Sequence, residues 1–294
     1  MADLQEKQFE LDGVVFGLYA DVGVIDWSPG APSIRTNDVD NPTGDGVRMG
    51  RDFKGTATWN FSMYVDGADE NDGWAKLAAL AEAWDGDWVR DEPDRVVPLR
   101  YKVAGEERVV FGRPRAWSAI VNNTSMSGRI DVEAQFVLID HRVYDATQRT
   151  FRVPVAVPLE LDAGLDVPFI APFTTSAGAS VRESAITVGG TVPTPITITF
   201  EGPIADAAVR IGGWTAALVD PVPADNPVVI DGRPWIRSAT YASDGGGARV
   251  SPRVTRISKM WLPPGHHEIV FTGDDPTSTA SVLVSWRNAY RTPR

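Results

Sequence analysis

The sequence predicts a mainly β protein made of two domains. Apolar and polar residues alternate through much of the first half, a single stretch has convincing helical spacing, and short apolar runs separated by Gly and Pro fill the second half. A chain of 294 residues also exceeds what one hydrophobic core usually organises. Its 43% hydrophobic and 23% charged residues are typical of a soluble globular protein.

Charge and proline content change together near the middle of the chain. Residues 1–150 contain 16 Lys and Arg against 26 Asp and Glu, whereas residues 151–294 contain 12 against 13. Only 6 of the 22 prolines lie before residue 151. We therefore place the domain boundary at residues 146–153 and expect one domain over 1–148 and a second over 149–294.

The first domain contains, near its N-terminus, a long polar stretch with few apolar residues. Loops as long as residues 28–52 inside a compact domain are usually functional or disordered. Residues 56–65 then alternate and place Trp59, Phe61 and Met63 on one face. This is the pattern of a half-buried strand.

One helix is predicted at residues 72–85. Its apolar residues recur at helical spacing, Asp72 can cap its N-terminus, and Gly86 stands just past its end. We expect the helix to pack on a sheet through Trp74 and Trp84.

Long strands joined by short or polar connections follow the helix. Residues 99–113 predict two strands around a four-residue loop that contains Gly105. Residues 129–139 again alternate strictly, and the chain leaves this strand at Asp140. The stretch from Arg108 to Tyr144 therefore indicates a scaffold and not a catalytic cluster.

The second domain is predicted to be an antiparallel β-sandwich. Segment 153–172 is rich in Pro, which has no N–H to donate, and should run extended over a surface or as an edge strand. Turn signals such as 212–213, 245–247 and 263–265 then separate short apolar runs. The predicted strands are 195–200, 208–211, 228–231, 235–241, 257–262, 267–272 and 280–286.

The composition excludes several classes of function. Nucleic-acid affinity comes mainly from Lys and Arg, so a net charge of −11 argues against sequence-specific nucleic-acid binding. The negative surface is either simply solvated or suited to a conduit through which DNA slides. No apolar run predicts membrane insertion, and no signal peptide is expected. The absence of Cys removes disulfides and thiolate metal sites and suits folding in a reducing cytoplasm.

No group of residues predicts a metal or cofactor site. His266 and His267 are adjacent on a predicted strand, so their side chains face opposite ways and cannot easily share one metal ion. The acidic runs 66–72 and 85–94 lack the ligand order of a calcium-binding loop. The glycines at 245–247 precede no helix and are most simply a hairpin tip.

No catalytic residues are predicted either. Ser125 and Ser127 lack the Gly-x-Ser-x-Gly frame, and with only His141, His266 and His267 there are few candidate bases for a serine triad. A glycosidase needs two positioned carboxylates, which 39 acidic residues cannot exclude by number. Four tryptophans lie on or beside predicted strands of the second domain, where core packing is the commoner fate and stacking on sugar rings the alternative. They are Trp214, Trp235, Trp261 and Trp286.

Several short motifs, each present once, are spread over most of the chain. They lie at 98–101, 110–115 and 136–145 in the first domain and at 189–195, 228–231, 261–265 and 284–290 in the second. In this order they resemble the distal tail proteins, or Dit-like minor tail proteins, of long-tailed bacteriophages, especially phages of actinobacteria. No single motif is diagnostic.

The resemblance implies a structural protein of the virion. In that family the N-terminal domain, a β-sandwich or split barrel with one helix, joins copies into a ring or belt, usually a hexamer, with a central channel for DNA. The C-terminal domain would be a galectin-like antiparallel β-sandwich that projects outward. The implied partners are the tail tube protein, a tail-associated lysin or hub protein, and fibre or receptor-binding proteins. The protein would fold in the host cytoplasm before it joins the tail tip. A ring interface would also account for the polar residues 28–52, which we expect to become ordered, at least partly, against a neighbouring subunit.

Two other classes of function remain open. A carbohydrate-binding module would be a monomer with exposed aromatic rings that bind cell-wall glycans. A glycan hydrolase would lose activity when one carboxylate is substituted. The second domain lacks the His-Asn-Arg and Trp-Glu-Arg pattern of galectins, which argues against sugar binding by analogy.

Overall fold

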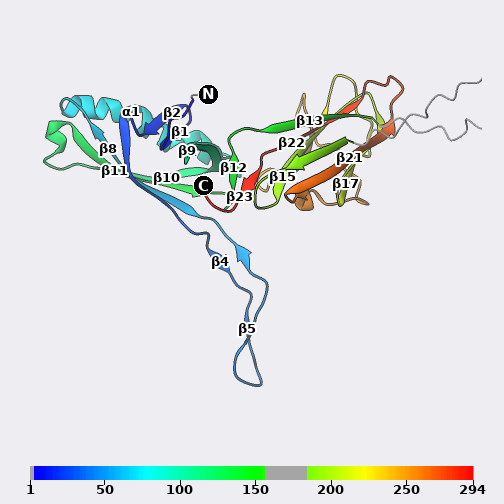
Figure 1. The fold of residues 1–294 in the computed structure, drawn as a ribbon, viewed down its shortest axis with the longest axis horizontal. Helices are drawn as coiled ribbons and strands as arrows, with labels where there is room; N and C mark the ends of the chain where they lie inside the picture. The colour runs from blue at the N-terminus through cyan, green and yellow to red at the C-terminus, as the bar shows by residue number, and fades with distance from the viewer. Residues whose placement is uncertain (1–2, 156–183, 294) are drawn as a thin grey trace, which may run out of the picture. The chain divides into compact units, whose positions relative to one another are not determined.

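The chain forms two compact units in the computed structural model, which describes residues 3–155 and 184–293 (Figure 1). Unit 1 comprises Met1–Ala146 together with Ala289–Arg294, and unit 2 comprises Thr147–Asn288. The sequence had placed residues 289–294 in the second domain, but this segment belongs to unit 1, where Ala289 and Tyr290 pair with residues 143–144. Unit 2 is therefore inserted between two parts of unit 1.

Unit 1 is built on a nine-stranded sheet whose main path runs β2-β1-β9-β10-β11-β8-β3. All of its strand pairs are antiparallel, and over the described residues the sheet stays open between β2 and β3. A side branch joins β10 to β12 and β12 to β23. The strands are β1 (Gln8–Leu11), β2 (Val14–Gly17), β3 (Val22–Pro29), β8 (Thr58–Asp66), β9 (Val97–Val103), β10 (Glu106–Ile120), β11 (Arg129–Leu138), β12 (Val143–Asp145) and β23 (Ala289–Tyr290).

The predicted alternation in the central strands is confirmed. Trp59, Phe61 and Met63 of β8 are buried, and β11 buries every second residue from Ile130 to Leu138. The predicted hairpin is also present, although β9 and β10 are joined by only two residues, Ala104 and Gly105, because pairing starts at Glu106. These strands supply most of the unit's core.

The predicted helix is present but begins earlier. Helix α1 (Glu70–Asp85) is capped by Asp69, whose side chain accepts the N–H of Asp72, and it ends at Gly86 in the left-handed conformation. The prediction that Asp72 is the cap was wrong, because Asp69 reaches the first free N–H groups one turn earlier. A short helix α2 (Asp87–Arg90), not predicted, follows at once.

One of the two helix tryptophans anchors α1 to the sheet. Trp84 is fully buried, and its indole N–H donates to the carbonyls of Ala116 at 3.1 Å and Gln135 at 3.2 Å. Trp74 is instead 38% exposed, so the prediction that both rings pack on the sheet holds for Trp84 only. At Gly73 an added Cβ would lie 2.7 Å from the carbonyl oxygen of Gly128, so only glycine permits this close approach.

The polar stretch predicted as a loop is a two-stranded hairpin. Strand β4 (Ile34–Arg35) pairs with β7 (Phe53–Lys54), and β5 (Val39–Asp40) pairs with β6 (Val47–Arg48). Backbone bonds from Gly30 to Thr58 and from Ser33 to Thr56 carry the ladder on from β3 and β8. We call residues 31–56 the hairpin arm.

Unit 2 is an antiparallel β-sandwich, as predicted. Its two sheets, β13-β22-β15-β18-β19 with β20 at the side and β14-β21-β16-β17, share one hydrophobic core in which Phe200 and Phe271 lie 5.9 Å apart between ring centroids. The strands are β13 (Arg149–Pro154), β14 (Ser184–Val188), β15 (Thr194–Glu201), β16 (Ala205–Ile211), β17 (Trp214–Ala217), β18 (Val228–Asp231), β19 (Ser238–Tyr241), β20 (Trp261–Leu262), β21 (Gly265–Asp274) and β22 (Ser281–Trp286).

Three details of unit 2 depart from the predicted strands or cannot be compared with them. Segment 257–262 starts as a 3-10 helix, Ile257–Lys259, before β20, and β19 begins only at Ser238. The start of segment 153–172 lies in β13, which pairs along β22, while residues 156–172 lie outside the described residues. Within the described ranges, no helix has the length and apolar content needed to cross a membrane.

Candidate functional site

The hairpin arm is the most exposed part of unit 1. Residues 33–54 are exposed without exception. Apolar side chains are included: Ile34 is 62% exposed, Val39 63%, Val47 49% and Phe53 40%. An isolated two-stranded hairpin is only marginally stable in water, and the exposed apolar side chains make this ribbon a candidate surface for contact with another molecule.

Close backbone packing fixes the base of the arm to the sheet. The N–H of Gly30 donates to the carbonyl of Thr58 at 3.0 Å, and an added Cβ at Gly30 would lie 2.2 Å from that oxygen. Ala57 is buried, and its carbonyl accepts the N–H of Leu138 at 2.9 Å. The arm therefore has a fixed root although its length is exposed.

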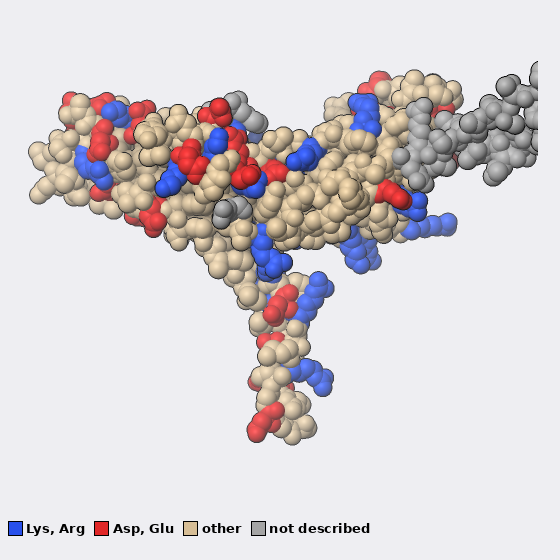
Figure 2. Space-filling model, in the orientation of Figure 1, with Lys and Arg blue, Asp and Glu red and all other residues tan. Residues whose placement is uncertain are grey.

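A second feature of unit 1 is an acidic surface over the helices. Residues 66–94 contain ten Asp and Glu against Lys76 and Arg90 alone, and red side chains gather over this region in Figure 2. Lys76 binds Asp72 at 2.8 Å, and this hydrogen bond holds the pKa of Asp72 below its ordinary value. We call residues 66–94 the acidic helical segment.

Several carboxylates of the acidic runs have partners within unit 1. Asp69 caps α1, Asp66 pairs with Arg129 at 3.2 Å, and Arg90 binds both Asp85 and Asp87 at 3.1 Å. Among the residues with described positions, no cluster of three or more His, Cys, Asp or Glu could hold a metal ion.

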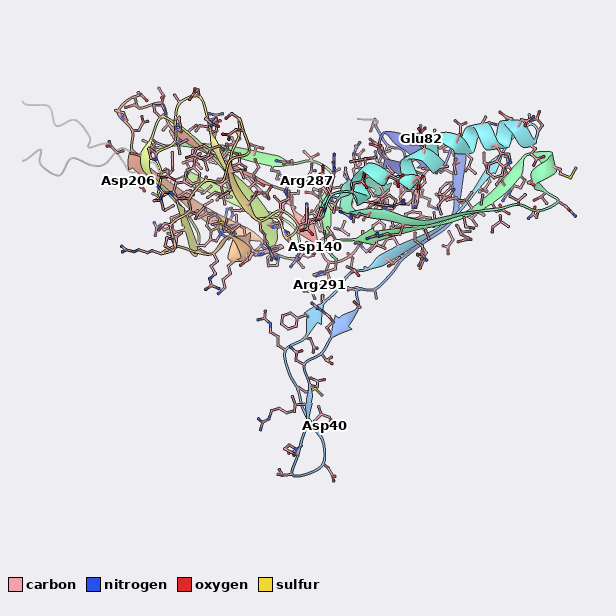
Figure 3. All side chains as sticks on the ribbon, turned by 180° about the vertical axis from the view of Figure 1, so that it is seen from behind. Asp40, Glu82, Asp140, Asp206, Arg287 and Arg291 are labelled. Atoms are coloured by element: carbon pink, nitrogen blue, oxygen red, sulfur yellow. The ribbon has the colours of Figure 1, made fainter. Side chains whose placement is uncertain are left out.

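The chain leaves β11 at a buried carboxylate, Asp140, labelled in Figure 3. Its oxygens accept the hydroxyl of Tyr144 at 2.5 Å and the guanidinium of Arg142 at 2.9 and 3.1 Å. His141 Nδ1 lies 3.3 Å from the same carboxylate. Burial lowers the pKa of His141; Asp140 opposes this effect, and the cations Arg142, Lys54 and Arg291 add to it. The cluster fixes the exit from the strand.

The C-terminal segment closes unit 1 beside this exit. Strand β23 pairs with β12, and the ring of Tyr290 lies 3.9 Å below the guanidinium carbon of Arg108. Arg108 also binds Asp145, and the hydroxyl of Tyr101 donates to the carbonyl of Pro293 at 2.7 Å. The sequence patterns did not indicate the contacts of β23, Tyr290 and Pro293, because their partners lie more than 140 residues earlier in the chain.

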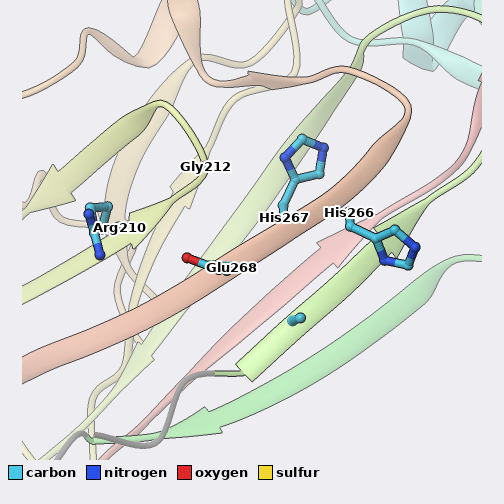
Figure 4. A pocket seen from close by; sticks show the side chains of 6 residues that line it. Arg210, Gly212, His266, His267 and Glu268 are labelled. Carbon is cyan, nitrogen blue, oxygen red and sulfur yellow. The ribbon is translucent and has the colours of Figure 1, made fainter.

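The histidine pair lies beside a shallow pocket of about 470 Å³ on unit 2 (Figure 4). The two imidazoles diverge, as expected on a strand: His266 Nδ1 lies 2.9 Å from the hydroxyl of Thr187, and His267 Nε2 lies 2.7 Å from the carbonyl of Pro263. The lining is Ala185, Arg210, Gly212, His266, His267 and Glu268. Among these described lining residues there is no Trp, Tyr or Phe ring on which a sugar could stack.

The other candidate residues also have structural roles. Trp214, Trp235 and Trp286 are at most 7% exposed, which confirms core packing for three of the four tryptophans, and Trp261 is partly buried. The hydroxyls of Ser125 and Ser127 donate to the loop carbonyls of Asn122 at 2.6 Å and Thr124 at 2.7 Å. The glycines at 245–247 form a turn after β19, as predicted.

Comparisons with known proteins point to one fold. No family model matches the sequence, and no curated protein matches it. Among solved structures, the crystal structure of the Dit (gp 19.1) protein of phage SPP1, described as a paradigm of the hub adsorption apparatus in phages that infect Gram-positive bacteria, matches with a TM-score of 0.58 and 14% identity. The match covers 96% of this chain and 98% of that one.

Two structures of the phage P2 baseplate in its activated conformation also match. The one with Ca gives a TM-score of 0.51 at 14% identity, and the one with Sr gives 0.51 at 13%. Each match covers 95% of this chain and 97% of the other. The chain therefore has the mainly β fold of a Dit-like distal tail protein, as the sequence motifs predicted.

Proposed function

We propose that this chain is a structural hub protein in the tail tip of a long-tailed bacteriophage. Copies would form a ring, usually six, that joins the tail tube to the hub, fibre and host-recognition proteins and leaves a central channel for DNA. The observation that carries this proposal is the match to SPP1 Dit over almost the whole of both chains, so both units are accounted for together.

Unit 1 is the ring-forming part in this proposal, and unit 2 is the domain that projects from the ring. The exposed arm provides unit 1 with a segment suited to contact between copies. The local contacts of the candidate serines, histidines and carboxylates are structural, which supports a role without catalytic turnover. The net charge of −11 supports a channel through which DNA passes without binding, because acidic surfaces repel phosphates.

Electron microscopy of the purified full-length protein tests the proposal. We expect rings with six-fold symmetry and a central opening, and antibody labelling of complete phage particles should place the protein at the junction of tube and tip. Particles that lack the protein and still carry complete, infectious tails would contradict the proposal. Specific binding of a monomer to cell-wall glycans would favour a carbohydrate-binding module instead.

A further inference from the structure

Both broad faces of the hairpin arm carry exposed apolar side chains. Residues paired across an antiparallel ladder share a face, and successive residues along a strand face opposite ways. Ile34 therefore shares one face with Lys54, while Phe53 shares the other with Arg35. Because Ile34 and Phe53 are both well exposed, neither face is purely polar at this end of the arm.

The same arrangement recurs nearer the tip of the arm. Val39 pairs with Arg48, and Val47 pairs with Asp40, so Val39 and Val47 lie on opposite faces. Their exposures are 63% and 49%. A hairpin that covers a partner with one face normally keeps its outer face polar. The repeated two-sided pattern indicates that both faces of the arm are covered in the assembled state.

The distribution of charge indicates which molecule covers the two faces of the arm. Residues 33–54 contain four basic and four acidic residues, whereas the rest of residues 1–146 contain 11 basic and 22 acidic residues. Two such acidic bodies repel each other when they approach, but an arm with no net charge does not add to that repulsion. Arg35, Arg48 and Lys54 lie in the paired strands of the arm and can also bind carboxylates of a neighbouring copy.

We propose that neighbouring copies of this chain enclose the hairpin arm on both faces, so that the arm is inserted into the ring and does not lie on its surface. This inference rests on the proposed ring. It differs from a simple contact between subunits because it requires residues on opposite faces of the arm to become inaccessible together.

The absence of cysteine makes a direct test possible. Single-cysteine variants Ile34→Cys and Phe53→Cys report on the two faces at the root of the arm, and Val39→Cys with Val47→Cys repeats the comparison near the tip. Ser243→Cys, at an exposed position of unit 2, is the control for reagent access. Maleimide labelling rates are measured for each full-length variant as a monomer and in the ring fraction isolated by size-exclusion chromatography.

We expect every arm variant to react at least about tenfold more slowly in rings than in monomers, while the control keeps its rate. Failure of one arm variant to form rings also supports burial of that face, because the side chain is exposed in the single chain. Protection of one face alone would overturn the two-sided arrangement. Rings whose arms label freely would overturn this inference and leave the ring proposal intact. If the unsubstituted protein itself stays monomeric, both the inference and the ring proposal are overturned.

Discussion

Replacement of Asp140 by Ala should strongly destabilise unit 1. The Asp140 side chain is 4% exposed and binds Arg142, which is 21% exposed. Removing one partner of a buried ion pair costs about 3–5 kcal/mol, and the partial exposure of Arg142 places Asp140→Ala near the lower limit, at about 3 kcal/mol. At about 1.4 kcal/mol per tenfold change, this is a roughly hundredfold loss in the folding equilibrium constant.

Urea denaturation measures the effect. With a slope of about 2 kcal/mol per molar urea, the midpoint of unit 1 should fall by about 1.5 M. Hydrogen exchange followed by mass spectrometry assigns each transition to its unit. Glu82→Ala removes the same charge from an exposed position of α1 and should change the stability by about 0.5 kcal/mol or less. Equal midpoints for the two variants would refute the role given to the Asp140 cluster.

Three further variants test other parts of unit 1. Trp84→Phe should cost about 2 kcal/mol because the carbonyls of Ala116 and Gln135 lose the N–H of a fully buried indole, whereas Trp88→Phe, at a residue 43% exposed, should cost little. Equal losses by urea denaturation would contradict this. Gly73→Ala should destabilise by about 1–3 kcal/mol despite the better helix propensity of Ala, since its Cβ meets Gly128, while exposed Asn71→Ala should not; a raised melting temperature for Gly73→Ala would show that the backbone yields. The lowered pKa of His141 means that the folded state resists its protonation, so unit 1 should lose stability as pH falls below about 6.5, and His141→Gln should remove part of that loss; His266→Gln is the control, and identical pH profiles would refute the assignment.

Much of the fold could be predicted because residues buried in the core recur along the sequence with the period of their strand or helix. Trp59, Phe61 and Met63 alternate because one face of β8 is buried, and Gly86 ends α1 in the conformation that glycine favours. The two helical residues before Asp72 were missed, since Asp69 and Asp72 are equally suitable caps and only the folded backbone selects one.

The sequence identified the candidate site by its polar composition but did not predict its hairpin structure. The hairpin arm was predicted as a loop because none of its faces is buried by this chain, so no alternation distinguishes its strands. The last strand, β23, was assigned to the wrong unit because its pairing with Val143 and Tyr144 depends on distant residues. Neither feature has a local signal.

The inserted arrangement of unit 2 has a consequence for biosynthesis. Strand β23 emerges from the ribosome only after all of Thr147–Asn288, and at about 5–20 residues per second that delay is about 7–28 s. During this interval the nascent first unit lacks the ring of Tyr290 over Arg108 and the acceptor for Tyr101. Polypeptides interrupted during translation of unit 2 would lack both contacts permanently.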